Sequence, residues 1–274
     1  MVASAHAELE VYEPFAYPAG ALNGQSGTNE FGVTGAWDAS PTALIGSNTL
    51  SYSSLPVTGR AIRGLSGSQN NYGGSRTLDP DGLLKTGLLA DGAVLWFSLI
   101  LGYDAGGNMT NSRLGFSLAN NSFNQGNYNY WINDDGSLLG SGVGVTLGNV
   151  GGGNGQVVAT QFQDLSAGDS IAGNVIGSWE GTTSRLGENE PALIVGKITW
   201  AATNDVIELY RPDTNLNLGP VISTLTVSVT QTNFDTLTWA RGDKVMLDEI
   251  RFGGSYTNVL GAFDPPSGTV INLQ

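Results

Sequence analysis

The sequence alternates short apolar segments with turns rich in glycine, asparagine and serine, and this pattern predicts an all-β chain. Residues 94–101 form the most apolar run of the chain, which predicts a strand buried on both faces at the centre of a sheet. The segment 191–211 predicts a hairpin, and the only helix that we expect lies within 162–172. Apolar and polar side chains alternate most clearly at residues 113–118, 128–133 and 221–231.

A late strand, residues 245–252, carries two adjacent carboxylates in its middle. Strict alternation predicts that Asp248 shares a face with Met246, Ile250 and Phe252, while Glu249 lies on the opposite face. A carboxylate on an apolar face needs hydrogen-bond donors, a cation or a metal, because an unpartnered buried charge is costly. Glu13, on a short apolar strand at 11–15, is the other acid that we expect nearby if the first and last strands pair.

The composition agrees with one large β domain. The 274 residues include 40 glycines and few charges (13%), and no repeat or linker divides the chain. We expect a short disordered start or trimmed leader at 1–9, a sandwich domain at 10–262 and a tail or linker at 263–274. The segment 5–7 is similar to the end of a secretory signal, but the charged and apolar regions that precede such an end are missing.

Charge and residue usage exclude several classes of function. A net charge of −13 argues against nucleic acid as a partner, and no cysteine is present for a disulfide or a thiolate site. The sequence contains no run of about 18 apolar residues, which is the length that predicts a membrane-spanning helix. The single histidine, His6, lies in the presumed leader, which argues against a Ser-His-Asp triad and a histidine-based lyase. Asp248 and Glu249 are consecutive, unlike the same-face acid pair of a glycosidase, so we expect no enzyme.

Six motifs, in this order, resemble the concanavalin A-like (LamG-like) jelly-roll domains of secreted bacterial surface proteins: residues 12–25, 95–100, 193–198, 209–212, 248–251 and 255–256. The resemblance implies a two-sheet antiparallel β-sandwich of jelly-roll type and a secreted, extracellular or cell-surface location. Its superfamily contains lectins, carbohydrate-binding modules and glycan-cleaving enzymes. It also implies a structural calcium between Glu13 and Asp248; the alternative is that backbone N–H groups, Arg76 or Arg63 satisfy Asp248.

Binding of a polysaccharide or other glycan requires aromatic faces that stack on sugar rings, with amides nearby for the hydroxyl groups. The segment 127–133 supplies both, and two further aromatic residues lie in polar stretches. The alternative is that these aromatic side chains fill the core or its rim. The candidate carbohydrate-binding residues are Tyr72, Asn127, Tyr128, Tyr130, Trp131 and Trp179.

A structural protein would have a similar composition. Residues 269–273 alternate like a strand without a local partner and follow Pro265 and Pro266. Such a tail can extend the sheet of a neighbouring subunit and link copies into a homo-oligomer, filament or surface layer. The other interpretation is a disordered linker. The sequence therefore predicts a non-catalytic, lectin-like carbohydrate-binding sandwich, with a self-assembling structural subunit as the alternative.

Overall fold

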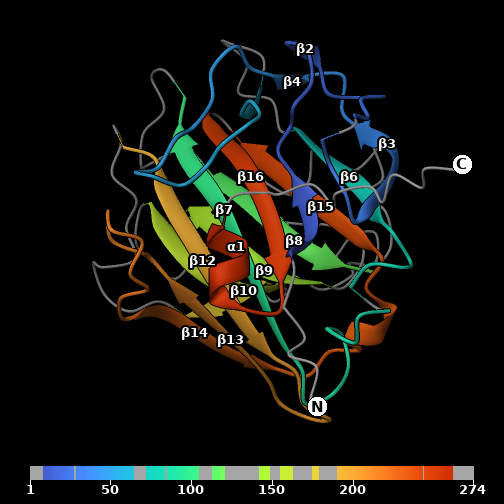
Figure 1. Cartoon of the computed structure of the whole chain (residues 1–274), viewed down its shortest axis with the longest axis vertical. Helices are drawn as coiled ribbons and strands as arrows, with labels where there is room; N and C mark the ends of the chain where they lie inside the picture. The colour runs from blue at the N-terminus through green and yellow to red at the C-terminus, as the bar shows by residue number, and fades with distance from the viewer. Residues whose placement is uncertain are drawn as a thin grey trace, which may run out of the picture.

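The computed structural model describes residues 9–27, 29–64, 72–83, 85–104, 113–120, 142–148, 155–162, 175–178, 190–242 and 244–261. These residues form two antiparallel β-sheets packed face to face, with one short α-helix on the outside (Figure 1). The two-sheet antiparallel β-sandwich predicted from the sequence is therefore confirmed.

The first sheet has nine strands, and the first and last strands of the fold pair within it. Strand β1 (Leu9–Glu13) runs antiparallel to β16 (Val245–Gly253), which is the pairing that the expectation for Glu13 and Asp248 required. The predicted hairpin is β12 and β13, and the apolar run 94–101 lies in β7 near the middle of the sheet. Apart from β1, the order is β14 (Val221–Val227), β13 (Asp205–Tyr210), β12 (Ala192–Thr199), β7 (Val94–Tyr103), β16, β5 (Ile62–Gly64), β4 (Ala43–Ile45) and β2 (Gly20–Ala21).

The second sheet has seven strands, all paired antiparallel. The alternating segment 113–118 is part of β8, whereas the segment 128–133 lies outside the described residues. The helix expected within 162–172 lies outside them too, except for Phe162, which ends a strand. The order is β11 (Val175–Ser178), β10 (Gln156–Phe162), β9 (Gly142–Gly148), β8 (Arg113–Ala119), β15 (Thr236–Gly242), β6 (Tyr72–Leu78) and β3 (Val33–Ala39).

A cluster of three phenylalanines lies at the centre of the core between the sheets. The ring of Phe97 lies 6.4 Å from Phe116 and 5.8 Å from Phe252, and the last two rings are 6.1 Å apart. Gly196, opposite Phe97 on β12, leaves room for this cluster, because a Cβ atom there would lie 2.0 Å from the Phe97 ring. The glycine inside this strand is thus required by packing.

Substitution Gly196→Ala should therefore destabilise the fold by about 1–3 kcal/mol, the usual effect of overfilling a packed core. Urea unfolding followed by tryptophan fluorescence measures this change. Thr199→Ala, at a partly exposed position of the same strand, is the control and should change stability by less than about 0.5 kcal/mol. An unchanged midpoint for Gly196→Ala would contradict this account of the core.

The outer face of the nine-stranded sheet carries a second apolar layer. Helix α1 (Tyr256–Leu260) packs on β7 and β16, and the segment 46–61 lies over the same region. Within the described residues, α1 is too short to span a membrane. In Figure 1 this helix lies in front of the nine-stranded sheet. The buried side chains of this layer are Leu50, Leu55, Ala61, Ile100, Leu193, Val195, Tyr210 and Val259.

Candidate functional site

Strand β16 contains a β-bulge at its two acids. Its pairing with β7 is irregular between Asp248 and Arg251, and Glu249 has a φ angle of 56°. An extra residue in a strand reverses the alternation beyond it. Ile250 and Phe252 therefore face the core between the sheets, while Asp248, Glu249 and Arg251 all bond to groups on the outer side. The prediction that Asp248 shares a face with Ile250 and Phe252 was wrong for this reason.

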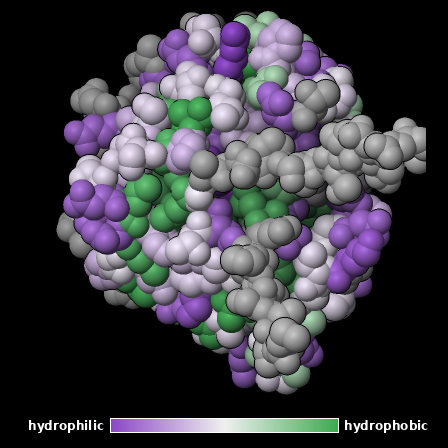
Figure 2. Space-filling view, viewed as in Figure 1, coloured by the Kyte–Doolittle hydropathy of each residue, from purple (hydrophilic) through white to green (hydrophobic). Residues whose placement is uncertain are grey.

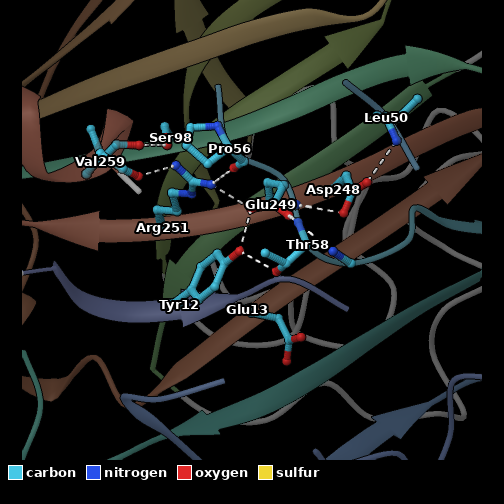
Figure 3. Close-up of polar contacts among 12 residues, drawn as sticks. Tyr12, Glu13, Leu50, Pro56, Thr58, Ser98, Asp248, Glu249, Arg251 and Val259 are labelled. Atoms are coloured by element: carbon cyan, nitrogen blue, oxygen red, sulfur yellow. Dashed lines mark hydrogen bonds and ion pairs between the residues drawn. The ribbon is translucent and has the colours of Figure 1, made fainter. Parts of the chain in front are cut away.

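Glu249 is the centre of a buried polar network (Figure 3). Its carboxylate accepts hydrogen bonds from the Tyr12 hydroxyl at 2.9 Å and from Arg251 at 2.8 Å. The backbone N–H groups of Thr58 and Gly59 donate to the other oxygen at 2.8 and 3.4 Å. Burial and the charge of Glu249 raise the pKa of Tyr12 to about 12. The carboxylate thus joins β1, β16 and the segment 46–61.

Arg251 extends this network to the end of α1. Its guanidinium lies 5.2 Å from the centre of the Tyr12 ring and donates to the carbonyl oxygens of Pro56 and, at 3.0 Å, Gly261. A buried guanidinium needs such acceptors because it stays charged and has five N–H donors to satisfy. Arg251 therefore holds both covering segments onto the outer face of β16.

Asp248 is satisfied by the backbone. Its Oδ2 atom accepts from the N–H of Leu50 at 2.9 Å, and its Oδ1 atom accepts from the N–H of Glu249 at 3.0 Å. Burial, followed by the charge of Glu249, raises the pKa of Asp248 well above its usual value. The prediction that backbone N–H groups satisfy Asp248 is confirmed.

This raised pKa predicts an effect on stability that depends on pH. In the folded protein Asp248 holds its proton more strongly than in the unfolded chain. Its contribution to the stability of the fold is therefore fully present below about pH 4 and is lost as the pH rises through the raised pKa. Asp248→Asn removes this loss. Its stability relative to the parent protein should therefore increase from about pH 4 upward and then level off.

Urea unfolding at a series of pH values measures this difference. Asp81→Asn, at an exposed aspartate, is the matched control and should show little pH-dependent change relative to the parent protein. A constant difference between Asp248→Asn and the parent protein across the range would contradict the assignment.

Glu13 lies in a different network, inside the sandwich. Both of its oxygens are occupied, and Arg76 also binds Glu30 at 2.8 Å. Burial raises the pKa of Glu13, while Arg76 and the hydrogen-bond donors lower it. Its carboxylate accepts from the Phe15 N–H at 2.8 Å, the Tyr17 hydroxyl at 2.8 and 3.0 Å, Trp37 Nε1 at 3.0 Å and Arg76 at 2.5 Å.

The calcium ion expected between Glu13 and Asp248 does not fit these surroundings. Glu13 points away from the Glu249 network, and no interaction joins it to Asp248 in Figure 3. Calcium prefers six to eight oxygen ligands, whereas Glu13 already faces the positive guanidinium of Arg76. In the described part of the chain, no three acidic or histidine side chains gather in a group suited to a metal. Arg63, the other expected partner of Asp248, pairs with Asp104 at 3.3 Å.

Most of the predicted carbohydrate-binding residues lie outside the described residues: Asn127, Tyr128, Tyr130, Trp131 and Trp179. Tyr72 is the first residue of β6, where the backbone alone is described. The predicted self-assembling tail at 264–274 also lies outside them.

The structure brings together a different aromatic cluster, on the outer face of the nine-stranded sheet. Trp96 stacks on Tyr210, with ring centres 6.1 Å apart and planes at 28°, and lies 5.7 Å from the Tyr256 ring of α1. Trp96 and Tyr256 are partly exposed. The Tyr256 hydroxyl donates a hydrogen bond to the backbone carbonyl oxygen of Leu216. This bond fixes the Tyr256 ring beside Trp96. An apolar ring surface therefore borders solvent at this point.

Two charged residues continue this surface across the sheet. Lys197 on β12 lies opposite Trp96 on the neighbouring strand β7. On the other side of β12, it lies opposite Glu208 on β13. The Lys197 Nζ and Glu208 Oε2 atoms are 2.9 Å apart, and the side chains are 30% and 24% exposed. Burial, together with the charge of Glu208 and a hydrogen bond to it, raises the pKa of Tyr210 to about 12. Figure 2 shows hydrophobic and hydrophilic side chains next to one another on the face that carries α1.

We call the residues Trp96, Lys197, Glu208, Tyr210 and Tyr256 the aromatic platform. Sequence reasoning missed it because the run 94–101 predicted burial on both faces, whereas Trp96 is partly exposed. The available signal was that Lys197 and Glu208 each interrupt an apolar strand of the predicted hairpin. Their position beside Trp96 depends on the pairing of β7 with β12, which no local pattern encodes.

The outer face of the seven-stranded sheet is lined by small polar residues. Ser117, Thr146 and Thr238 are at most 5% exposed, and within the described structure their hydroxyls have no hydrogen-bond partner. Each unmet hydrogen bond of a buried group costs about 1–3 kcal/mol. Because these three side chains are buried, they offer a dissolved ligand no direct contact, in contrast to the aromatic platform.

Fold and site together define a two-sheet antiparallel β-sandwich with a partly exposed aromatic and charged surface on one sheet. No protein family model matches the chain, and no curated protein does.

Solved structures similar to the chain include the alginate lyase vAL-1 from Chlorella virus, at 8% identity over 80% of this chain and 93% of that chain, with a TM-score of 0.43. The CBM2 module of the Lactobacillus casei BL23 phage J-1 evolved Dit matches at 12% identity over 94% of this chain and 98% of that chain, with a TM-score of 0.43. The Emp47p carbohydrate recognition domain matches at 10% identity over 90% of this chain and 97% of that chain, with a TM-score of 0.43. Similarity at this level identifies no family for the chain.

Proposed function

We propose that the chain is a non-catalytic carbohydrate-binding β-sandwich whose aromatic platform receives the glycan. The observation that carries this proposal is the partly exposed side chain of Trp96, which contacts the rings of Tyr210 and Tyr256 and is bordered by the Lys197–Glu208 pair. Sugar rings present flat C–H faces that pack on aromatic rings, and their hydroxyl groups need both donors and acceptors. The platform supplies all three kinds of group.

The surroundings of the acids support the non-catalytic part of the proposal. Glu13, Asp248 and Glu249 are fully buried, and each is held by hydrogen bonds within the fold. A glycosidase needs two carboxyl groups open to the sugar on either side of the bond to be cleaved. Acids that hold strands and covering segments together do not have that freedom.

The proposal includes a secreted or cell-surface location in a bacterium, which follows from the resemblance to concanavalin A-like domains. Tyr128, Tyr130, Trp131 and Trp179 stay predicted as further glycan contacts. Alanine substitution at each of these positions tests that prediction in the assay described next.

Native gel electrophoresis through gels that contain polysaccharide tests the proposed function. The parent protein should be retarded by at least one polysaccharide, and Trp96→Ala should weaken binding by about two- to tenfold, since an aromatic contact contributes about 0.5–1.5 kcal/mol. Trp96→Phe keeps an aromatic ring and should lose less affinity than Trp96→Ala. Thr77→Ala, exposed on the other sheet, is the control and should bind like the parent.

Two results would overturn the proposal: no retardation of the parent protein by any glycan, or equal retardation of Trp96→Ala and the parent. Circular dichroism of each variant separates loss of binding from loss of fold.

A further inference from the structure

The aromatic platform belongs to a row of side chains that crosses the sheet. The register places Leu9, Gly253, Trp96, Lys197, Glu208 and Thr224 opposite one another on six neighbouring strands. All of them except Gly253 are partly exposed. Neighbouring strands lie about 4.8 Å apart, so the row from Trp96 to Thr224 spans roughly 14 Å. This length exceeds that of one sugar ring.

We infer that this row binds a linear, uncharged polysaccharide that lies across the strands, an inference that rests on the proposed function. The chain stacks one sugar on Trp96 and places the next sugars over Lys197, Glu208 and Thr224.

The shape of the surface favours an extended chain over a chain end. On one side of the row, the Tyr210 and Tyr256 rings form a wall. On the other side lies a second row of short, partly or fully exposed side chains, namely Val94, Thr199, Val206 and Thr226. At the far end of the row, Thr224 is partly exposed on β14, the edge strand of the described sheet. Because no further strand follows β14 in this sheet, a chain longer than the row can continue past Thr224.

The charges of the row favour a neutral ligand. Lys197 and Glu208 neutralise each other at 2.9 Å, so the row has no unbalanced cation for a carboxylate or sulfate group. The net charge of −13 repels polyanions at longer range. Both side chains are exposed enough to reach sugar hydroxyls, with the ammonium group as donor and the carboxylate as acceptor.

The test compares neutral and acidic glycans and then varies chain length. Xylan, mannan and a soluble cellulose derivative without charge serve as neutral probes in affinity gels, with alginate and polygalacturonate as acidic probes. Oligosaccharides of the best neutral probe, from one sugar to six, are then titrated calorimetrically. We expect affinity to rise by at least about tenfold from the monosaccharide to the tetrasaccharide and then to level off. Reduction of the chain end of the hexasaccharide should leave its affinity unchanged, because a chain longer than the row can place that sugar outside it.

Two variants locate the ligand along the row. Thr224→Ala should weaken binding of the tetrasaccharide and leave the disaccharide unaffected, because only the longer chain reaches β14. Glu208→Gln leaves Lys197 unpaired and should increase binding of polygalacturonate relative to the neutral probe.

The inference fails if a monosaccharide binds as tightly as the tetrasaccharide, if reduction of the chain end abolishes binding, or if the parent protein prefers the acidic probes. These results leave carbohydrate binding itself intact. Binding of none of the glycans overturns the proposed function instead, so the two failures are distinguishable.

Discussion

Replacement of Arg76 by alanine should destabilise the protein by about 3–5 kcal/mol, the usual cost of removing one partner of a buried ion pair. Arg76 and Glu13 are 2% and 0% exposed, and Arg76 also binds Glu30. Without the guanidinium, Glu13 must either hold a buried charge that only neutral donors face or take up a proton, and both cost stability. Because small domains are stable by about 5–15 kcal/mol in total, this single change removes a large part of the margin.

A double variant separates charge from packing. Glu13→Gln combined with Arg76→Met removes both charges of this pair, so it should recover the part of the stability loss that comes from Glu13, while Glu30 stays without its cation. Urea unfolding of the parent protein and the two variants measures the difference. A loss below about 1 kcal/mol for Arg76→Ala, or a double variant no more stable than the single one, would contradict the role assigned to this pair.

Arg251→Met should have an effect of similar size, about 3–5 kcal/mol, on the outer side of the same sheet. It leaves Glu249 with a buried charge and frees the carbonyl oxygens of Pro56 and Gly261. These carbonyls belong to the segment 46–61 and to the end of α1. The loss should therefore be greatest where these segments cover β16.

Hydrogen exchange provides the local measurement for this prediction. The amides of Leu50, Thr58 and Gly59 donate to Asp248 and Glu249, so they should exchange faster in Arg251→Met than in the parent protein. Arg63→Met, which breaks the more exposed Arg63–Asp104 pair, is the control and should lose at most about 1 kcal/mol. Unchanged exchange at the three amides would show that Arg251 does not hold this segment.

The class of fold could be predicted because its signals are local. Alternation with a period of two marks β8, and the most apolar run of the chain marks β7. The antiparallel pairing of β12 and β13 follows from two apolar segments that are separated by a short turn. The first and last strands do pair, as the expected meeting of Glu13 and Asp248 required, but their carboxylates lie in separate networks.

The sites could not be predicted in the same way, because they depend on contacts between distant parts of the chain. Glu13 and Arg76 are 63 residues apart, and Glu249 receives its backbone donors from the segment 46–61. The bulge at Glu249 decides which face its neighbours occupy, yet nothing in the alternation of β16 marks the inserted residue.

An acidic, cysteine-free chain of many short strands in two antiparallel sheets therefore follows from the amino-acid pattern, because strand periodicity and turn residues act locally. The acids that are buried with Arg76 and Arg251, and the side chains that meet beside Trp96, follow only from the packing of distant strands. This packing sets the register: a shift of one residue between two paired strands moves every side chain to the other face, and only the packed sheet fixes that shift.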